Sequence, residues 1–299
     1  MYLVIGANGF LGSYLIKNIK ENTDEKIVAA ARNIDICNDD ETVHWVKCDV
    51  TDFESVTALK KCVGNEKELK IFYLAAFHHI DKIPLEPFTA WNVNITSLAN
   101  FLNVFSDAKS LFFTSTDCVY GEGREIAHDY RFKESDPLLP ICTYGIHKMT
   151  AEALVTGAGF NVSRMPFMLG KSLAKGKKHF YDNITESLKN GEKIRMLEGF
   201  LRSALDYDTA ARLLVNLSEK QSKDRNVEQI INVCGDESYS KYDIGIVIAD
   251  KLGVSPELVE KQPESAAEMF YKEKRAKTGL MDNSLLKDVL GLEEIKMKL

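Results

Sequence analysis

The chain begins with the stretch Tyr2-Leu3-Val4-Ile5-Gly6-Ala7-Asn8-Gly9-Phe10-Leu11-Gly12, which decides the fold. An apolar run typical of a buried strand meets glycines spaced G-x-x-G-x-x-G, and a helical pattern follows. Glycine permits a tight turn, lets the backbone approach a pyrophosphate, and lets the helix pack close to the sheet. The amino end of the helix offers free N–H groups to phosphates. We therefore expect a dinucleotide-binding turn rather than an ordinary glycine-rich turn, formed by Gly6, Asn8, Gly9, Phe10, Leu11 and Gly12.

Short apolar runs alternate with helical patterns through the first half of the chain. Strands are expected at 2–5, 26–31, 43–46, 71–75, 111–114 and 161–165, and helices at 12–20, 53–63, 88–105 and 144–156. Strands that alternate with helices predict an α/β fold with a Rossmann-type, doubly wound parallel sheet. Ligands bind such sheets at the carboxyl ends of the strands.

The pattern loosens after Met165. A loop rich in glycine and lysine is expected at 170–178, helices near 180–189, 205–217 and 241–252, and a strand near 230–233. We expect the dinucleotide-binding Rossmann domain to comprise residues 1–165 plus about 200–234. A smaller C-terminal substrate-binding domain would then comprise about 166–199 and 235–299.

The composition narrows the functional classes. With 45% hydrophobic and 27% charged residues among 299, the chain has the composition of a soluble globular protein. A net charge of −6 without a basic block argues against nucleic acid as a partner. No apolar stretch reaches the roughly 20 residues that span a bilayer, so no membrane partner is expected. The scattered cysteines include no C-x-x-C pair, which argues against a metal site. Together with a first strand that has no charged leader, they predict a cytoplasmic location.

The end of the second expected strand bears on the choice of cofactor. An acidic residue there would hold the ribose hydroxyls of NAD, whereas an arginine accommodates the 2′-phosphate of NADP. The residues are Ala30-Ala31-Arg32-Asn33, and no carboxylate occurs until Asp35. Arg32 therefore favours NADP(H) over NAD(H), unless it is an ordinary surface residue after a strand.

Two further strand ends carry candidate cofactor contacts. After the third strand, we expect Asp49 to accept a hydrogen bond from the adenine amino group, with the N–H of Val50 beside it. Asp52 is a candidate cap for the next helix. The fourth strand ends in Leu74-Ala75-Ala76, whose alanines would let the backbone approach a cofactor or would simply pack within the sheet.

The fifth strand and the helix after it carry the candidate catalytic groups. The strand runs into Thr116, and Tyr144 and Lys148 follow on a helix, where positions i and i+4 share a face. Hydride transfer to a ketone needs a proton donor at the developing alkoxide, and the tyrosine pKa of about 10 is high for that role near neutrality. We expect the Lys148 ammonium, helped by an oxidised nicotinamide ring, to lower the pKa of Tyr144. Lys148 would also hold the nicotinamide ribose. Thr116 would hold the same substrate oxygen as Tyr144.

These motifs together resemble the extended short-chain dehydrogenase/reductase family, of the NAD-dependent epimerase/dehydratase type, over nearly the whole chain. The glycine turn, Ala75-Ala76, the segment 115–121 and Tyr144-x-x-x-Lys148 stand in that family's order. The resemblance implies action on nucleotide-linked sugars. It also implies that Asn92, in Trp91-Asn92-Val93-Asn94, braces the active-site helix next to the cofactor.

The segment Thr116-Asp117-Cys118 bears on the reaction. Sugar-nucleotide 4,6-dehydratases have Asp-Glu here, with the Glu as acid/base, so Cys118 argues against dehydration. The dTDP-4-dehydrorhamnose reductase group, to which this segment is most similar, has Thr-Asp followed by an aromatic residue. Epimerase-reductases that make GDP-fucose have an acid/base cysteine paired with a distant histidine, for which His179 is the candidate. A buried thiol and a surface histidine are the simpler interpretation.

Other polar residues are candidates for substrate contacts. His79, in His78-His79-Ile80-Asp81, resembles part of the dehydratase loop. Neighbouring side chains on an extended chain point opposite ways, so this pair of histidines does not predict a metal site. Arg202 would bind a substrate phosphate or form an ordinary ion pair. The lysines of 171–178 would attract a diphosphate or cover a solvated loop.

The sequence leads to three hypotheses. The first is an NADP(H)-dependent reductase of a nucleotide-linked 4-keto deoxy sugar. The second is an NAD-dependent sugar-nucleotide epimerase or dehydratase, with Cys118 and His179 as a candidate acid/base pair. The third is a non-catalytic nucleotide-sensing regulator, which the intact Thr116, Tyr144 and Lys148 argue against. An apolar stripe along 88–105 predicts a helical homodimer interface or core packing.

Overall fold

The larger sheet of the protein is parallel. In a computed structural model that describes residues 1–35, 37–64, 66–223 and 228–299, seven strands form it in the order β11-β7-β5-β4-β1-β2-β3. These strands are β1 (Tyr2–Ile5), β2 (Ile27–Ala31), β3 (Val43–Lys47), β4 (Lys70–Tyr73), β5 (Ser110–Thr116), β7 (Asn161–Met165) and β11 (Ile230–Asn232). The order runs outward from β1 in both directions, which is the doubly wound arrangement. The predicted fold class is confirmed.

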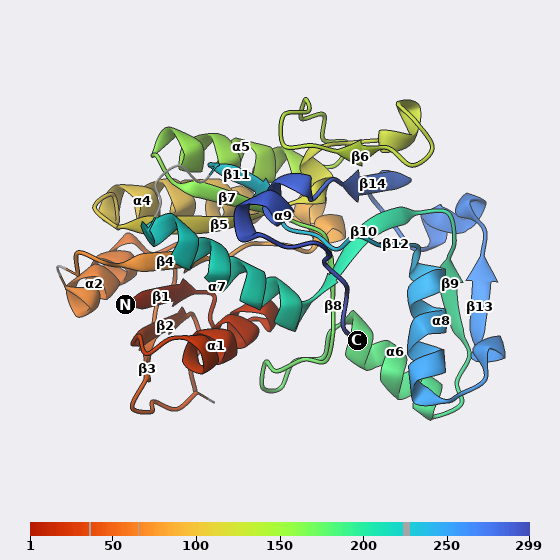
Figure 1. Cartoon of the computed structure of the whole chain (residues 1–299), viewed down its shortest axis with the longest axis horizontal. Coiled ribbons are helices and arrows are strands. Elements are labelled where there is room, and N and C mark those ends of the chain that lie inside the picture. Colours follow the sequence, from red (N-terminus) through yellow and green to blue (C-terminus); the bar gives the residue numbers. More distant parts are fainter. Residues whose placement is uncertain (36, 65, 224–227) are drawn as a thin grey trace.

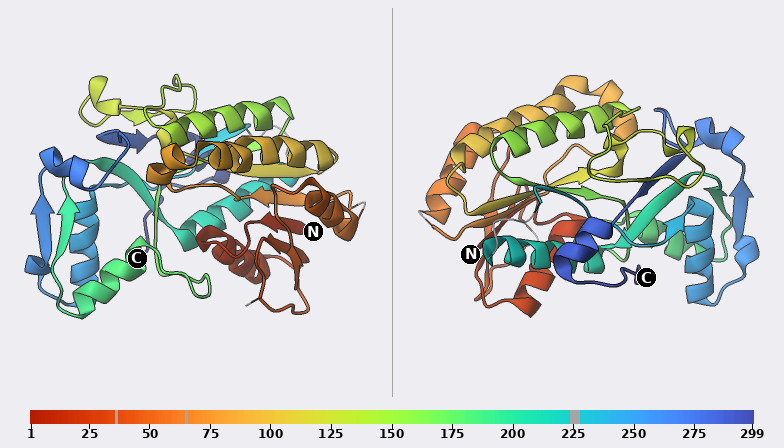
Figure 2. Two further views of the ribbon diagram at one scale, coloured as in Figure 1. Left: turned by 180° about the vertical axis from the view of Figure 1, so that it is seen from behind. Right: turned by 45° about the horizontal axis from the view of Figure 1, so that its top comes forward.

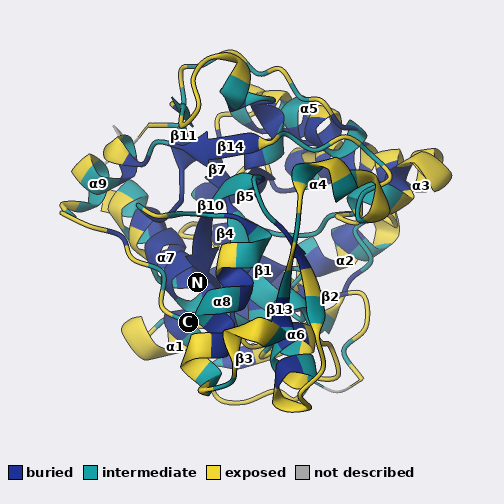
Figure 3. Cartoon of the chain, turned by 90° about the vertical axis from the view of Figure 1, so that its right-hand side faces the viewer, coloured by how far each residue is buried: buried dark blue, intermediate teal, exposed yellow. Residues whose placement is uncertain are grey.

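Helices cover both faces of this sheet (Figure 1). One face carries α1 (Phe10–Asn22), α7 (Tyr207–Lys223) and α9 (Ser284–Leu290), and the other carries α2 (Phe53–Val63), α4 (Ser97–Val104) and α5 (Thr143–Gly157). Successive residues of β1 enter opposite cores: Tyr2 and Val4 pack with α1 and α7, and Leu3 with α2 and α4. Burial on both faces explains why the strands of this sheet read as continuous apolar runs (Figure 3).

Several predicted elements coincide with observed ones. The bounds of α2 and β7 match the predictions, as do those of α6 (Phe180–Lys189) and α8 (Lys241–Leu252). The predicted helix over 205–217 begins too early, because Leu205 lies in strand β10 (Leu201–Asp206) and α7 starts at Tyr207. Within the described part of the chain, we find no helix with the length and apolar character to cross a bilayer.

The predicted helix over 88–105 is wrong as one continuous element. It consists of α3 (Pro87–Trp91), a π-helical turn over Asn92–Thr96, and α4. A π turn holds one residue more than an α turn and therefore rotates the residues before it relative to those after it. As a result, Leu98 is fully buried, whereas Phe88 is 88% exposed and Trp91 45% exposed. The apolar stripe is partly core and partly surface.

A smaller sheet and a helical layer form the other half of the molecule (Figure 2). Strands β12 (Ser238–Tyr239), β10, β14 (Thr278–Met281) and β6 (Arg131–Phe132) are neighbours in that order, and β8 (Phe167–Leu169) also pairs with β10. Beside them, β9 (Ile194–Leu197) pairs with β13 (Val259–Gln262), and α6 and α8 pack on a shared core. Strands β6 and β10 thus join this sheet although they fall in ranges expected for the dinucleotide-binding domain.

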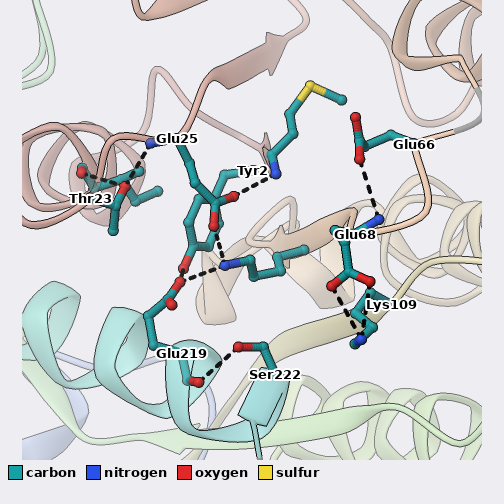
Figure 4. Close-up of polar contacts among 11 residues, drawn as sticks. Tyr2, Thr23, Glu25, Glu66, Glu68, Lys109, Glu219 and Ser222 are labelled. Carbon is teal, nitrogen blue, oxygen red and sulfur yellow. Dashed lines mark hydrogen bonds and ion pairs between the residues drawn. The ribbon is translucent and has the colours of Figure 1, made fainter.

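A polar cluster fastens α7 to the amino ends of β1 and β4 (Figure 4). Lys70 is 4% exposed, forms ion pairs with Glu25 and with Glu219 (2.6 Å), and lies 4.7 Å from the centre of the Tyr2 ring. The Tyr2 hydroxyl donates to Glu219. Because the charges in this cluster are paired and lie at the opposite end of the strands from the glycine turn, the cluster is structural.

Candidate active site

The glycine turn after β1 has the shape that a phosphate-binding turn requires. Gly6 has a φ of +83°, and a Cβ on Gly12 would lie 2.5 Å from the Gly6 carbonyl oxygen. Only glycine fits either position without displacement of the backbone. At the start of α1, no side chain caps the helix and no acidic residue stands in its first turn. The free N–H groups at this end are available for an anion, so the turn fits a dinucleotide pyrophosphate.

A cavity of about 910 Å³ extends from this turn along the carboxyl ends of the strands. Lys148 lines it, and so do Gly6, Gly9, Phe10, Leu11, Gly12, Leu74, Ala76, His79, Thr116, Tyr144 and His179. A second cavity of about 640 Å³ opens toward the smaller half of the molecule, lined by His79, Thr116, Asp117, Cys118, Tyr144, His179 and Arg202. The two cavities therefore meet at Thr116 and Tyr144. We call the first the cofactor cavity and the second the substrate cavity, after the ligands predicted for them. The eight single residues that the sequence nominated for catalysis and substrate binding lie on their walls, namely His79, Thr116, Asp117, Cys118, Tyr144, Lys148, His179 and Arg202.

Several predicted cofactor contacts do not line the first cavity, namely Asn8, Arg32, Asp49, Val50, Ala75 and Asn92. The Asn8 side chain donates to the Asn33 carbonyl at 2.6 Å and so ties the glycine turn to the end of β2. Asp49 accepts hydrogen bonds from the Thr51 N–H and hydroxyl. Although partial burial opposes it, those bonds and nearby Arg32 lower the pKa of Asp49. Asp52 caps α2 by accepting from the Glu54 N–H at 3.0 Å.

The brace predicted for Asn92 is made by Asn94 instead. Asn92 is exposed, whereas Asn94 is 4% exposed. The Asn94 side chain accepts from the Phe77 N–H at 2.8 Å, donates to the Phe77 carbonyl at 3.2 Å, and contacts the His147 ring of α5 at 3.3 Å. The π turn accounts for the exchange of Asn92 for Asn94, because its extra residue changes which asparagine faces Phe77 and α5.

Lys148 and Tyr144 have strongly shifted pKa values in the protein without cofactor. The Lys148 ammonium is buried and donates to the Thr114 carbonyl at 2.6 Å, and burial lowers its pKa to about 7. Burial, together with the neighbouring Cys118 and Asp117, raises the pKa of Tyr144. Without a bound cofactor, Lys148 therefore does not depress the Tyr144 pKa. The phenol is protonated at neutral pH, which is the state of a proton donor.

Asp117 organises the floor of the substrate cavity. Its carboxylate accepts hydrogen bonds from the Thr116 hydroxyl at 2.9 Å and from the Cys118 thiol at 3.5 Å. The other carboxylate oxygen lies 3.5 Å from Nε of Arg202, whose guanidinium also donates to the carbonyls of Leu201 and Ala276. Of the two roles weighed for Arg202, the ion pair is the one that this geometry displays.

Cys118 and His179 lie on the same wall without a bond between them. The Cys118 thiol contacts the Cys142 thiol, and this contact and burial raise the pKa of Cys118. A thiol with a raised pKa is a poor base near neutrality. The His179 ring contacts the Tyr207 hydroxyl at 3.2 Å and packs on the Phe10 ring with centroids 4.6 Å apart. His179 is thus half-buried at the junction of the cavities and not a surface residue.

The expected orientation of His78 and His79 is wrong. Their rings stack with centroids 4.4 Å apart, because the chain turns here into a 3-10 helix and is not extended. Within the described ranges, no three His, Cys, Asp or Glu side chains converge as a metal site would need. The stacked pair lines both cavities.

A segment near the C-terminus also closes the substrate cavity, and the sequence analysis missed it. Asp81 pairs with Arg275 at 2.9 Å and accepts from the N–H groups of Lys272 and Glu273 at 3.0 Å. Glu273 in turn accepts from the Thr143 hydroxyl at 2.6 Å, at the start of α5. These contacts hold residues 270–275 at the wall of the substrate cavity. The available signal was Asp81 in the His-Ile-Asp stretch, but nothing in the sequence paired it with Arg275.

Known proteins similar to this chain include enzymes of nucleotide-sugar metabolism. The profile of the family described as RmlD substrate binding domain matches residues 1–298. The chain is 23% identical over 301 residues to the dTDP-4-dehydrorhamnose reductase of Aggregatibacter actinomycetemcomitans, covering 97% of this chain and 93% of that protein. It is 32% identical over 163 residues to the low-salt glycan biosynthesis protein Agl12 of Haloferax volcanii, covering 51% of this chain and 50% of that protein. The chain therefore spans about half the length of that second relative.

Solved structures share the fold. A dTDP-4-dehydrorhamnose reductase (rfbD) from Bacillus anthracis in complex with NADP superposes with a TM-score of 0.79 at 19% identity, covering 99% of this chain and 94% of that one. Other solved structures of this fold hold NAD. At such low identity the likeness shows the fold alone.

Proposed function

The chain belongs to the RmlD substrate binding domain family, and from that premise we propose that it is an NADP(H)-dependent reductase of a nucleotide-linked 4-keto deoxy sugar. The junction of the two cavities supports this proposal. A dinucleotide in the first cavity and a ketone in the second would meet at Thr116 and Tyr144, which line both.

One observation carries the proposal, namely the state of the two carboxylates that line the substrate cavity. Asp117 is held by Arg202, Thr116 and Cys118, and Asp81 is held by Arg275 and two backbone N–H groups. Neither is free to remove a proton from a sugar carbon, which a dehydration requires. The group left at the junction is the protonated Tyr144, which suits addition of one hydride and one proton to a ketone.

Each residue at the junction would have a separate role in the reduction. Bound NADPH would supply a hydride from its nicotinamide ring. Tyr144 would donate its phenolic proton to the substrate carbonyl oxygen, and the Thr116 hydroxyl, turned from Asp117, would donate a second hydrogen bond to that oxygen. Lys148, fixed to the Thr114 carbonyl at 2.6 Å, would hold the nicotinamide ribose and stabilise the tyrosinate as its proton leaves.

The preference for NADP(H) rests on the end of β2. Arg32 is exposed next to the glycine turn, and no carboxylate of β2 occupies the place where ribose hydroxyls of NAD are held. The first carboxylate after β2 in the sequence is that of Asp35, three residues beyond Arg32.

Lys241 is the candidate ligand for the substrate's diphosphate. It lines the substrate cavity at the start of α8, with its ammonium 5.4 Å from the centre of the Phe180 ring and 4.8 Å from that of Tyr271. Among the described residues it has no carboxylate partner, unlike Arg202 and Arg275 on the same walls. A cation between two aromatic rings without a counter-ion favours an anionic ligand.

The test is NADPH oxidation with dTDP-, GDP- and UDP-linked 4-keto-6-deoxy sugars, repeated with NADH. We expect stoichiometric oxidation that is faster with NADPH. If no ketone is reduced and NAD stays bound to the protein through purification, the reductase assignment is contradicted.

The second candidate is an NAD-dependent epimerase or dehydratase of the same substrates. Its specific support is that Cys118, His79 and His179 line the substrate cavity and could move a second proton. Under this alternative the cofactor is regenerated in each turnover, so a sugar isomer or dehydrated sugar would form without net oxidation of NADPH. A non-catalytic regulator would bind nucleotide and convert none of these substrates.

A further inference from the structure

The loop that joins β8 to α6 crosses from the smaller half of the molecule to the glycine turn. Figure 1 shows it reaching toward α1. Three contacts fix it there: the Tyr14 hydroxyl donates to the Lys171 carbonyl at 2.9 Å, the Lys177 ammonium donates to the Asn8 carbonyl at 2.9 Å, and the His179 ring packs on Phe10. The lysine-rich loop, expected to attract a substrate diphosphate or to be solvated, thus stands over the cofactor cavity.

Lys177 brings an unneutralised charge to this turn. It lines the cofactor cavity, and the one acceptor found for it in the described chain is the neutral Asn8 carbonyl. The charge of its neighbour Lys178 is neutralised, because the Lys178 ammonium donates a hydrogen bond to the Glu186 carboxylate at 2.6 Å. A cation held by a neutral acceptor gains from an anionic ligand that approaches the same turn.

Asn8 connects this charge to the end of β2. Its side chain donates to the Asn33 carbonyl at 2.6 Å while its own carbonyl accepts from Lys177. Lys177 is therefore linked through Asn8 to Asn33, the residue that follows Arg32 in the sequence. The charges of Lys175 and Lys177 also reach Cys37, beyond β2, where they oppose the rise in the thiol pKa that burial causes. Lys175 and Lys177 therefore place two positive charges near the chain that follows β2, where Asp35 contributes a negative one.

We propose that Lys177 is a ligand of the 2′-phosphate of NADP(H), acting with Arg32. The proposal rests on the cofactor preference in the proposed function and adds a residue from the other half of the chain. NADPH and NADH differ in this one phosphate, so a ligand of it distinguishes the two cofactors. A ligand of the pyrophosphate would not, since both cofactors carry that group.

The experiment measures the dissociation constants of NADPH and NADH for the full chain by titration of their fluorescence, without a sugar substrate. Lys177→Met should weaken NADPH about tenfold, the typical loss of one charge-assisted hydrogen bond, and NADH less than about twofold. Lys177→Arg should keep most of the preference for NADPH. Lys171→Met is the matched control, since it removes the same charge from the same loop but its side chain does not line the cofactor cavity.

Three results would overturn the inference. Unchanged affinity for both cofactors would show that Lys177 touches neither, and equal weakening of both would place it on the pyrophosphate. A wild-type chain that binds NADH as tightly as NADPH would also overturn it. By contrast, NADPH binding that depends on Lys177 in a protein that reduces no 4-keto sugar would contradict the proposed reaction and leave this inference standing.

Discussion

At the scale of single residues, the chemistry depends on polar groups that the fold buries at the carboxyl ends of β4 and β5. Lys148 is 3% exposed and Thr116 8% exposed, so protein atoms cover most of both side chains. Groups in such surroundings have altered pKa values and fixed directions, which is the usual condition of catalytic side chains.

Removal of the Tyr144 hydroxyl tests its role as proton donor. Tyr144→Phe should lower kcat by about 10²–10⁴-fold, the usual contribution of a general acid. The dissociation constant of NADPH should stay within about twofold, because no cofactor phosphate contact is assigned to this hydroxyl. Tyr130→Phe, which removes a hydroxyl that donates to Asp136 away from both cavities, is the control. A Tyr144→Phe protein with ordinary kcat would refute the assignment.

The buried ammonium of Lys148 makes stability depend on pH. Burial lowers its pKa to about 7. The folded state therefore disfavours the charged form, and the cost is complete below about pH 7 and fades toward about pH 10, where the unfolded chain also loses the proton. Lys148→Met should be more stable than the wild type at about pH 6. The difference should shrink by roughly 2–3 kcal/mol at about pH 9, measured by urea unfolding of the cofactor-free protein.

The control for this measurement is Lys20→Met, which removes an exposed lysine paired with Asp40. Its effect on the free energy of unfolding should be the same at the two pH values. An equal effect of Lys148→Met at both values would mean that the ammonium is not penalised by burial.

Sequence reasoning predicted the members of the site better than their contacts. Thr116, Tyr144 and Lys148 were brought to one place because parallel strands end at a shared edge and i, i+4 positions share a helix face. The raised pKa of Tyr144 was not predictable, because it arises from burial and from Cys118 and Asp117 in three dimensions.

At the scale of elements, the π turn over Asn92–Thr96 sets which asparagine braces the site. Asn94→Ala should cost about 1–3 kcal/mol of stability, because the partly buried N–H and carbonyl of Phe77 lose their partner. It should also weaken cofactor binding, since the segment that follows β4 lines the cofactor cavity. Asn92→Ala, an exposed site two residues away, should change stability by no more than about 0.5 kcal/mol. Urea unfolding measures both variants. A larger loss of stability in Asn92→Ala than in Asn94→Ala would contradict the assignment of the brace to Asn94.

Periodicity predicted the strands of the larger sheet, most of the helices that cover it, and α6 and α8, because long amphipathic or fully buried runs carry a strong signal. It did not predict the short helix α9. It missed the strands outside the larger sheet, each of two to six residues, which are β6, β8, β9, β10, β12, β13 and β14. Strands this short are specified by their partners in the sheet and not by their own sequence pattern.

At the scale of the whole molecule, exposed apolar residues in and just before α3 predict a homodimer. Leu85 and Phe88 are 69% and 88% exposed, and Trp91 contacts His147 of α5, whose neighbour Ile146 is 44% exposed. Apolar side chains gathered on adjacent helices are typical of an association surface. We expect sedimentation to show a dimer for the wild type and a folded monomer for Phe88→Asp. Phe53→Asp, at an exposed phenylalanine of α2, should remain dimeric, and a wild-type monomer would contradict the prediction.

At the same scale, we propose that the two cavities, one from each half of the molecule, meet so that a hydride and the Tyr144 proton add to a sugar ketone. The most direct test supplies NADPH deuterated at the transferable position with an accepted 4-keto-6-deoxy nucleotide sugar and examines the product by nuclear magnetic resonance. We expect one deuterium on carbon 4 of the sugar for each molecule of oxidised cofactor released. A product without deuterium, formed while the NADPH is not consumed, would contradict it.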